Sequence, residues 1–521
     1  MKAYREAVEK LASVKDFVPE KRPLLEEAFN FLTSSSKPFL LLNAPTGYGK
    51  TLLSFALTLH SLSDASLFDR VIHVLPIRSI IEDVQKTSEQ AFGFSRTKMM
   101  GSSDEFMHLF PLNITTVDTF TWDLLKLNTK RRHLIKARIE FGYDYLTQAS
   151  ILTSLVVFDE AHFLLEEESM ATAFSSVVEF LTSQGIPIVV MTATLSQGHV
   201  EFFKKHAMKN KYEFRVLKPD ENDYFVRREL EKDISITFNN GDPLNFIEPG
   251  MRNAIIVNEV KRAIELYNRA IAGDVGFENS NVILIHGRMK PSHKRALIER
   301  LRGLKDCEFL LIGTQAVEAG VDFSSDVMIT DCAPINSLLQ RFGRVARHAK
   351  DSKGKVIVLE DAPPGPYLEE KIKLTVSLLR EKRIHPRIPA TYEDIINKVH
   401  GSEIGSIKKL INQSLKGKLV KFMEDPSKRA PHVLGEIETL VQNGTLIMRS
   451  FLIPLSVDGE IVLISPKKFT ELHFKGLVEV KGMTANINNL KDAYRIAKSV
   501  ALGENVEIIY TGQYDEERGI I

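Results

Sequence analysis

Ala44-Pro45-Thr46-Gly47-Tyr48-Gly49-Lys50-Thr51 lies between the apolar run Phe39–Asn43 and a second apolar stretch, Leu52–Leu62. A strand, a glycine-containing turn and a helix in this order are typical of a loop that binds nucleotide phosphates. Its glycines let the backbone curl so that amide groups face the phosphates. Lys50 can then reach the β and γ oxygens, and the Thr51 hydroxyl can bind Mg²⁺. The stretch predicts an ATP site, with alanine in place of the usual first glycine.

Apolar runs of strand length alternate with helical stretches on both sides of a short polar segment, Lys218–Asp223. Before this segment the runs are Phe39–Asn43, Val71–Leu75, Ile114–Val117, Leu155–Phe158 and Ile188–Met191. After it they are Ala254–Val257, Val282–His286, Phe309–Ile312, Val327–Thr330 and Val356–Leu359. Because strands that alternate with helices form parallel sheets, the sequence predicts an α/β protein with two tandem, doubly wound parallel-sheet domains.

Domain boundaries follow from segments that continue neither a helix nor a strand. The polar segment separates the first two domains, and the proline-rich segment Ala362–Pro366 ends the second. We therefore expect an ATP-binding domain at residues 1–217, a second domain at 218–361 and a C-terminal accessory α+β domain at 362–521. The elements expected in that last domain are a helix at Tyr367–Lys382 and strands at Leu446–Leu455 and Glu460–Ile464.

Composition excludes several classes of protein. The chain of 521 residues is too long for one hydrophobic core, and 44% hydrophobic against 26% charged residues argues against long disorder. Its 68 basic side chains balance 67 acidic ones, so any contact with nucleic acid must be local. The two cysteines, Cys307 and Cys332, form no metal-binding pair and fit a reducing compartment. No run approaches the roughly 18 apolar residues of a membrane span, so we expect a cytoplasmic protein with no membrane partner.

Two acidic residues follow the apolar run Leu155–Phe158, in the tetrapeptide Asp159-Glu160-Ala161-His162. Ligands of doubly wound folds bind at the carboxyl edge of the sheet, where both carboxylates emerge. Asp159 can hold Mg²⁺, and Glu160 can position the water that attacks the γ-phosphate. The next run ends in Met191-Thr192-Ala193-Thr194, where the hydroxyls of Thr192 and Thr194 can hydrogen-bond this tetrapeptide. We expect these threonines and His162 to report the nucleotide state to the second domain.

The second domain carries two further stretches that resemble helicase motifs V and VI, Gly313–Asp322 and Gln340–Arg347. Gly320 and Asp322 from the first stretch and Gln340 from the second are expected at the ATP site. Phosphoryl transfer needs a cation opposite the γ-phosphate that the first domain does not supply, so we expect Arg344 and Arg347 to act as arginine fingers. Because these arginines and the phosphate loop lie on different domains, ATP turnover is expected to drive domain motion.

Residues outside these motifs make the resemblance more specific. They are Leu75–Ile81, Thr116–Asp118, Ile256–Ala263, Leu284–Met289 and Ala333–Arg341, within residues 38–360. With them the sequence resembles the type I CRISPR-associated signature helicases, DEAD/DEAH-box proteins of superfamily 2 built on two RecA-like domains. The resemblance implies a motor that uses ATP and Mg²⁺ to move 3′ to 5′ on single-stranded DNA. It also implies recruitment to foreign DNA by a guide-RNA surveillance complex of the Cascade type.

The resemblance also implies which residues contact the DNA strand. On the first domain they are Pro76, Arg78, Thr116 and Asp118, and on the second His286, Arg288, Thr314 and Gln315. Amides, hydroxyls and a few cations at these positions can grip phosphates without reading bases. Members of the family show an arginine and a glutamine before the phosphate loop for adenine recognition. Here Arg22 supplies the arginine, and no glutamine accompanies it.

A second departure from the family concerns the HD nuclease that commonly precedes the helicase. The phosphate loop begins at Ala44, and none of the fourteen histidines is followed by aspartate. We therefore expect the split form, in which the HD nuclease is a separate polypeptide and this chain has no nuclease activity of its own. An RNA helicase or a DNA-repair helicase of superfamily 2 would share the same motor motifs. A nucleotide-binding scaffold without turnover would need a broken motif, whereas the residues expected to act on ATP are all present.

Overall fold

The computed structural model describes residues 1–15, 20–63, 66–76, 81–98, 107–128, 131–139, 142–273, 275–318, 321–401, 404–442, 452–482, 487–501 and 506–521. Contacts divide the chain into two compact units. Unit 1 comprises Met1–Phe225, His400–Ser450 and Lys498–Asn505. Unit 2 comprises Val226–Val399, Phe451–Ala497 and Val506–Ile521. Each unit contains its own parallel sheet, as two apolar cores require.

Unit 1 contains a seven-stranded parallel sheet with the strand order β3-β4-β2-β5-β6-β1-β7. Its strands are β1 Pro38–Asn43, β2 Arg70–Leu75, β3 Ser95–Lys98, β4 Leu112–Thr116, β5 Ser154–Phe158, β6 Ile188–Thr192 and β7 Glu213–Leu217. The central strands β1, β5 and β6 are buried along their whole length, which explains their continuous apolar runs. The sequence did not predict β3 and β7, the two edge strands, because both carry charged residues and neither forms an apolar run.

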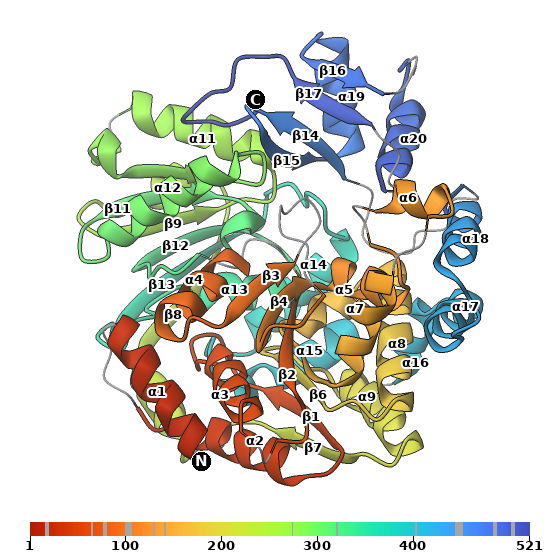
Figure 1. Ribbon diagram of the computed structural model, residues 1–521. Helices are drawn as coiled ribbons and strands as arrows, with labels where there is room; N and C mark the ends of the chain where they lie inside the picture. Colours follow the sequence, from red (N-terminus) through yellow and green to blue (C-terminus); the bar gives the residue numbers. More distant parts are fainter. Residues whose placement is uncertain are drawn as a thin grey trace. The chain divides into compact units, whose positions relative to one another are not determined.

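Helices cover both faces of this sheet (Figure 1). They are α1 Lys2–Lys15, α2 Pro23–Ser34, α3 Thr51–Ser61, α4 Ile81–Ala91, α5 Val117–Leu124, α6 Arg132–Lys136, α7 Gly142–Leu152, α8 Glu168–Ser183 and α9 Gln197–Lys209, with a 3₁₀ turn, η2, at Ala161–Leu165. Val117, predicted as the end of a strand, is instead the first residue of α5. Thr116 ends the strand because its side chain accepts a hydrogen bond from Thr119 N and caps the helix.

Three helices from the C-terminal part of the chain also belong to unit 1. They are α16 Ile404–Leu410, α17 Gln413–Glu424 and α18 Ala430–Gln442. The helix α17 packs along α8 (Figure 1), and Lys416 Nζ lies 2.5 Å from a carboxylate oxygen of Glu179. The buried Lys126 donates hydrogen bonds to the carbonyls of Asp425 and Lys428. Residues beyond 361 are thus shared between the units, and the boundaries expected at 217 and 361 stay predictions.

Unit 2 contains a six-stranded parallel sheet with the order β10-β11-β9-β12-β13-β8. Its strands are β8 Asp233–Asn239, β9 Arg252–Ile256, β10 Val282–Ile285, β11 Phe309–Gly313, β12 Val327–Asp331 and β13 Lys353–Leu359. Its helices are α11 Val260–Ala272, α12 Pro291–Gly303, α13 Ile335–Phe342, α14 Glu369–Glu381 and α15 Glu393–His400. The helix α10 Tyr224–Leu230 begins in unit 1 and ends in unit 2. The 3₁₀ turns are η3 Pro243–Phe246, η4 Asn279–Asn281, η5 Gln315–Val317 and η6 Pro389–Thr391. The helix predicted at Tyr367–Lys382 corresponds to α14.

A smaller mixed sheet, with the order β15-β14-β17-β16, completes the fold. Its elements are β14 Ile453–Val457, β15 Glu460–Ile464, β16 Val478–Lys481 and β17 Glu507–Tyr510, with helices α19 Pro466–Phe474 and α20 Leu490–Ala501. The outer pairs are antiparallel, and β14 pairs with β17 in parallel. Two doubly wound parallel sheets with an accessory α+β part confirm the predicted fold class.

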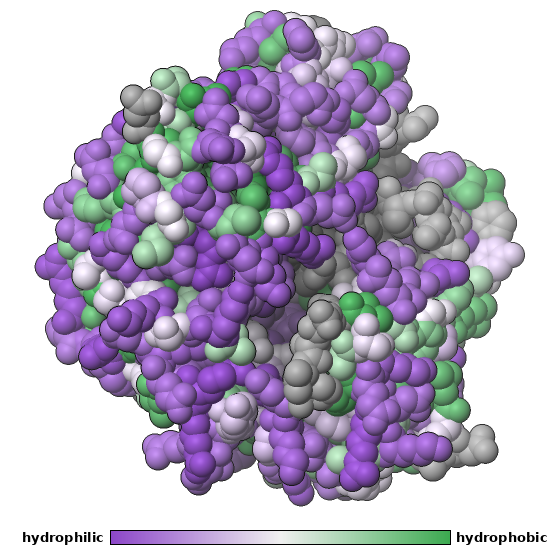
Figure 2. All heavy atoms as spheres, turned by 90° about the vertical axis from the view of Figure 1, so that its left-hand side faces the viewer, coloured by the Kyte–Doolittle hydropathy of each residue, from purple (hydrophilic) through white to green (hydrophobic). Residues whose placement is uncertain are grey.

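Figure 2 shows one face on which hydrophilic residues predominate and hydrophobic residues are scattered. Within the part of the chain that the structure describes, no helix has both the length and the apolar character needed to cross a bilayer.

Candidate active site

The phosphate loop connects β1 to α3 through a turn that requires glycine. Gly47 and Gly49 have φ values of +85° and +92°, a region that side-chain-bearing residues rarely adopt. A Cβ at either position would meet no atom within 4 Å, so backbone conformation and not space selects glycine here. Lys50 is 7% exposed, and its Nζ donates a 3.0 Å hydrogen bond to the Ala44 carbonyl across the loop. The loop thus holds its lysine inward, where phosphates would bind.

The two carboxylates expected to act on ATP lie next to this lysine, at the carboxyl end of β5. Glu160 Oε1 is 3.4 Å from Lys50 Nζ, and Asp159 Oδ1 accepts a 2.9 Å hydrogen bond from Glu160 N. Glu160 has a φ of +47°, an uncommon conformation for a residue other than glycine that recurs at active sites. Its Oε2 is buried and accepts no hydrogen bond within the described ranges, so it is available to a water molecule.

Burial acts differently on the two carboxyl groups. It raises the pKa of Glu160 above its ordinary value, and the nearby Lys50 offsets only part of this effect. Burial alone would also raise the pKa of Asp159, but His73 and Lys50 together hold that pKa below its ordinary value. The arrangement keeps Asp159 ionised, as a Mg²⁺ ligand must be, and makes Glu160 the more basic carboxylate of the pair.

The structure adds His73, a residue that motif reasoning missed. His73 is fully buried on β2, its Nε2 lies 3.5 Å from Asp159 Oδ2, and its Nδ1 is 2.8 Å from Ser54 Oγ. Strands β2 and β5 are paired so that Val74 lies beside Phe158, which brings His73 behind the aspartate. The available sequence signal was a histidine inside the otherwise apolar strand 71–75, where a buried polar group needs a partner.

The residues expected to couple the site to motion form a connected set in unit 1. His162 Nδ1 is 2.8 Å from Thr192 Oγ1 and 3.5 Å from Glu160 Oε2. Thr192 Oγ1 also accepts a 3.1 Å hydrogen bond from Thr194 N. Thr192 lies beside Asn43, the last residue of β1, which fixes this set at the edge that carries the phosphate loop. A change at Glu160 can therefore reach the loop after β6 through direct contacts.

Arg22 and two aromatic rings adjoin the phosphate loop. Arg22 Nε donates a 3.1 Å hydrogen bond to the Tyr48 carbonyl, and its guanidinium lies 5.5 Å from the Tyr48 ring and 5.4 Å from the Phe225 ring. The Tyr48 hydroxyl donates a 2.5 Å hydrogen bond to Asp223. These contacts fix Arg22, which the family resemblance implies for adenine recognition, and the cation–π contacts stabilise its guanidinium.

In unit 2 the three arginines of the stretch 340–347 have different environments. Arg341 is fully buried and donates to Glu318, Thr330 and Asn258, so it holds the fold. Arg344 donates a 2.6 Å hydrogen bond to the Glu318 carbonyl, and Arg347 Nε lies 3.4 Å from Asp322 Oδ1.

Arg344 and Arg347 each keep part of a buried guanidinium without a partner. Arg344 Nε and Arg347 Nη1 make no hydrogen bond in the described part of the chain. Of the three arginines in the stretch 340–347, Arg344 and Arg347 thus keep free guanidinium donors, which the role of an arginine finger requires. Gln340 is buried on α13, and Gly320 lies outside the described residues.

The residues assigned to nucleic-acid contact lie at the carboxyl ends of strands in each unit. In unit 1, Leu75 pairs with Thr116, so the buried Pro76 and the helix cap at Thr116 are neighbours, with Asp118 in the first turn of α5. Arg78 lies outside the described residues. In unit 2, Ile285 pairs with Gly313, which places the next residues, His286 and Thr314, side by side.

A C-terminal segment covers His286 within unit 2. His286 Nδ1 accepts a hydrogen bond from Arg288 N, so its Nε2 carries the proton and donates to the Arg518 carbonyl at 2.8 Å. The Arg288 carbonyl in turn accepts a hydrogen bond from Ile520 N. Gln315 Nε2 donates to the Asn258 carbonyl at 3.3 Å. Both ring nitrogens of the buried His286 therefore have partners within unit 2.

Comparisons with known proteins agree with this geometry. The DEAD/DEAH box helicase family matches residues 22–202, and the C-terminal part of the CRISPR-associated nuclease/helicase Cas3 family matches residues 250–350. The CRISPR-associated helicase Cas3 of Thermoproteus tenax is 25% identical over 427 residues, which cover 78% of this chain and 71% of that protein. The chain belongs to the Cas3 helicases of superfamily 2.

Solved structures of the Cas3 family share this fold. The crystal structure of T. fusca Cas3 with AMPPNP superposes with a TM-score of 0.61 at 15% identity, covering 98% of this chain and 66% of that one. A chain in a CRISPR RNA-guided surveillance complex in its pre-nicking state gives a TM-score of 0.52 at 18% identity, covering 77% of this chain and 53% of that one. The present chain therefore spans less than two thirds of each of these Cas3-like chains.

Proposed function

We propose that this chain is an ATP-driven motor that moves 3′ to 5′ along single-stranded DNA and unwinds target DNA in type I CRISPR interference. The observation that carries the proposal is the cluster of Lys50, Asp159 and Glu160 at one sheet edge of unit 1. A binding scaffold would not need a left-handed Glu160 with a free buried oxygen beside a lysine.

Each of the site residues would have a separate role in ATP hydrolysis. Lys50 and the amides of the phosphate loop would bind the β- and γ-phosphates, and Glu160 would orient the attacking water and accept its proton. Arg344 and Arg347 would stabilise the charge that develops on the γ-phosphate. The hydroxyl of Thr51 and the carboxylate of Asp159 would hold Mg²⁺, which would supply positive charge to neutralise the phosphates. A hydroxyl and an ionised carboxylate are ligands that fit this hard cation.

Family membership supports the role in CRISPR interference and the DNA substrate. The surveillance-complex structure supports recruitment by a Cascade-type assembly, because a chain with this fold is present in it. We further propose that a separate HD nuclease cuts the DNA. This part rests on the sequence, in which none of the fourteen histidines is followed by aspartate.

The test of the motor is steady-state ATP hydrolysis with Mg²⁺, without nucleic acid and with single-stranded DNA or RNA of matched length. We expect DNA to stimulate turnover and Lys50→Ala to abolish it. Glu160→Gln should keep ATP binding and lower kcat by roughly 10²–10⁴-fold, because phosphate contacts survive while proton acceptance is lost. Stimulation chiefly by RNA would favour an RNA helicase, and full turnover by Glu160→Gln would refute the role of that residue.

The nuclease partner needs its own experiment. A separately expressed HD nuclease is mixed with the chain and a surveillance complex loaded on target DNA, and strand cleavage is measured with and without ATP. We expect ATP-dependent degradation only when both proteins are present. Cleavage by the chain alone, abolished by a chelator and retained in Lys50→Ala, would contradict the proposal of a separate nuclease.

A further inference from the structure

The loop that carries the two arginine fingers is held by residues outside every helicase motif. We call residues 343–348, which follow α13, the finger loop. Its Ala346 has a φ of +45°, a conformation that costs free energy in a residue other than glycine and persists only where the surroundings impose it. The contacts that impose it come from Arg387, Lys232 and Glu229, which are buried in unit 2.

Arg387 makes most of these contacts. Its Nη1 donates hydrogen bonds to the carbonyls of Gly343, at 3.3 Å, and Val345, at 2.7 Å. Its Nη2 donates to the Ala346 carbonyl at 2.9 Å. Its Nε donates to Glu229 Oε2 at 2.6 Å, and the side chain is 1% exposed. One planar guanidinium thus binds three carbonyls of the finger loop while a carboxylate fixes its orientation.

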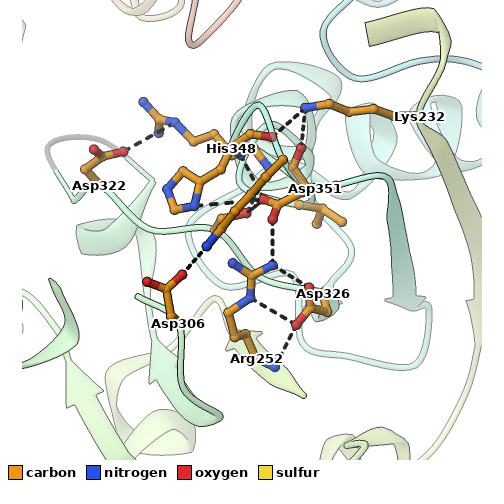
Figure 3. A network of polar contacts seen from close by, with 12 residues as sticks. Lys232, Arg252, Asp306, Asp322, Asp326, His348 and Asp351 are labelled. Atoms are coloured by element: carbon orange, nitrogen blue, oxygen red, sulfur yellow. Dashed lines mark hydrogen bonds and ion pairs between the residues drawn. The ribbon is translucent and has the colours of Figure 1, made fainter. Parts of the chain in front are cut away.

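Lys232 completes the same cluster. Its Nζ donates to the carbonyls of Ala346, at 2.8 Å, and His348, at 3.0 Å, and lies 3.0 Å from Glu229 Oε1. Figure 3 shows Lys232 reaching this part of the loop, close to His348. Glu229 therefore pairs with both cations. Four carbonyls of the finger loop, those of Gly343, Val345, Ala346 and His348, accept hydrogen bonds from them.

Asp351 and Ser324 bind N–H groups of the finger loop. The carboxylate of Asp351 accepts hydrogen bonds from His348 N at 2.8 Å, Ser324 Oγ at 2.6 Å and Arg252 Nη2 at 3.0 Å (Figure 3). Ser324 Oγ in turn accepts a 2.8 Å hydrogen bond from Arg347 N. The N–H of Arg347 is thus fixed by Ser324, and the carbonyls before and after it, those of Ala346 and His348, are fixed by Arg387 and Lys232.

We infer that Arg387, oriented by Glu229 and assisted by Lys232, is a positioning residue for ATP hydrolysis that sets where Arg344 and Arg347 lie. This inference rests on the proposed function. Burying charges is costly, and apolar residues of similar volume often give equal or greater stability, so a buried cluster of this kind is poor evidence for a purely stabilising role. Because its hydrogen bonds converge on one loop, its consequence is a single loop conformation.

The test is the substitution Arg387→Met, which keeps an unbranched, flexible side chain in the buried site and removes every donor. We expect kcat for DNA-stimulated ATP hydrolysis to fall on the order of 10- to 100-fold, as when a catalytic group is misplaced by about 1 Å. KM for ATP should stay near the wild-type value, because Lys50 and the phosphate loop belong to unit 1. Arg387→Lys keeps the charge but not the planar fork, so it should restore part of kcat.

A double-variant cycle separates positioning from general stability. If Arg387 acts through the fingers, Arg387→Met should lower kcat by a smaller factor in the Arg347→Ala variant than in the wild type. Arg380→Met on the neighbouring helix α14, where Arg380 pairs with Glu360, is the matched chemical control. Leu379→Ala, a buried residue of the same core, is the control for lost stability. Both controls should keep the wild-type kcat well below their melting temperatures.

The outcomes are distinguishable from those of the proposed function. The inference alone is overturned if Arg387→Met keeps the wild-type kcat. It is also overturned if the fold loss of kcat in the double variant equals the product of the fold losses in Arg387→Met and Arg347→Ala. The proposed function and the inference are both overturned if the wild type hydrolyses ATP no faster than Lys50→Ala. The same holds if Arg344→Ala and Arg347→Ala both keep the wild-type kcat. If Arg387→Met fails to fold, the same cycle is measured with Arg387→Lys and Glu229→Gln, for which the same criteria apply.

Discussion

At the scale of residues, His73 controls the environment of the expected Mg²⁺ ligand. Its contacts with Asp159 and Ser54 run through buried side chains, so they orient the carboxylate from behind. We predict that His73→Leu raises the Mg²⁺ concentration for half-maximal ATP hydrolysis by about 10- to 100-fold, the usual cost of losing such a partner. Mn²⁺ binding followed by electron paramagnetic resonance gives a second readout. Ser54→Ala, with His73 retained, should show a smaller shift; an unchanged Mg²⁺ dependence in His73→Leu would contradict this role.

His286 makes a second residue-scale prediction, for stability against pH. Burial lowers the pKa of His286 to about 4, against 6.5 in the unfolded chain. A group whose folded-state pKa is lowered stabilises the fold above the unfolded pKa, and this stability is lost as pH falls from 6.5 towards 4. Relative to His286→Gln, the wild type should lose on the order of 2 kcal/mol between pH 7 and pH 5. Urea unfolding at both pH values measures this difference. Equal losses of unfolding free energy in the wild type and His286→Gln would contradict a lowered pKa for His286 in the folded protein.

Residues differ in how far the sequence reveals them. The phosphate loop and the acidic pair are predictable because backbone geometry and metal chemistry restrict each position to one or two residue types, as the φ values of Gly47 and Gly49 illustrate. His73 and Arg387 contact residues that only the fold brings near. Asp159 is 86 positions from His73 along the chain, and the carbonyls bound by Arg387 are 41 to 44 positions from it. No local pattern predicts such partners.

At the scale of elements, the apolar face of α17 explains how a C-terminal helix becomes part of unit 1. Leu419 on α17 is fully buried, and α17 packs along α8. Leu419→Ala should lower the free energy of unfolding of unit 1 by about 2–5 kcal/mol through the cavity that it leaves. The chain's single tryptophan, Trp122, lies on α5 of unit 1, so its fluorescence reports this transition. Leu368→Ala, at an exposed site of unit 2, is the control; equal midpoints for the two variants would mean that α17 is not needed for unit 1.

Elements were predictable in proportion to their burial. Central strands such as β1 and β6 are covered on both faces, so their apolar runs stand out in the sequence. The edge strand β3, with the sequence Ser-Arg-Thr-Lys, has no such run and is defined by its pairing with β4. The place of α16–α18 in unit 1 also depends on tertiary packing, which a linear reading of composition does not contain.

At the scale of the whole molecule, the groups proposed to act on ATP are divided between the two units, and binding and hydrolysis should therefore be separable. A non-hydrolysable ATP analogue with Mg²⁺ at 100 times its Kd should stabilise unit 1 by about 2.7 kcal/mol, measured through Trp122. The variant Arg344→Ala/Arg347→Ala should keep this stabilisation and lose roughly 10³-fold or more in kcat, because only the transition state needs the fingers. Lys50→Ala should lose both. If the arginine variant instead loses the stabilisation and keeps its kcat at saturating ATP, these arginines contribute to ATP binding in the ground state and not to the transition state.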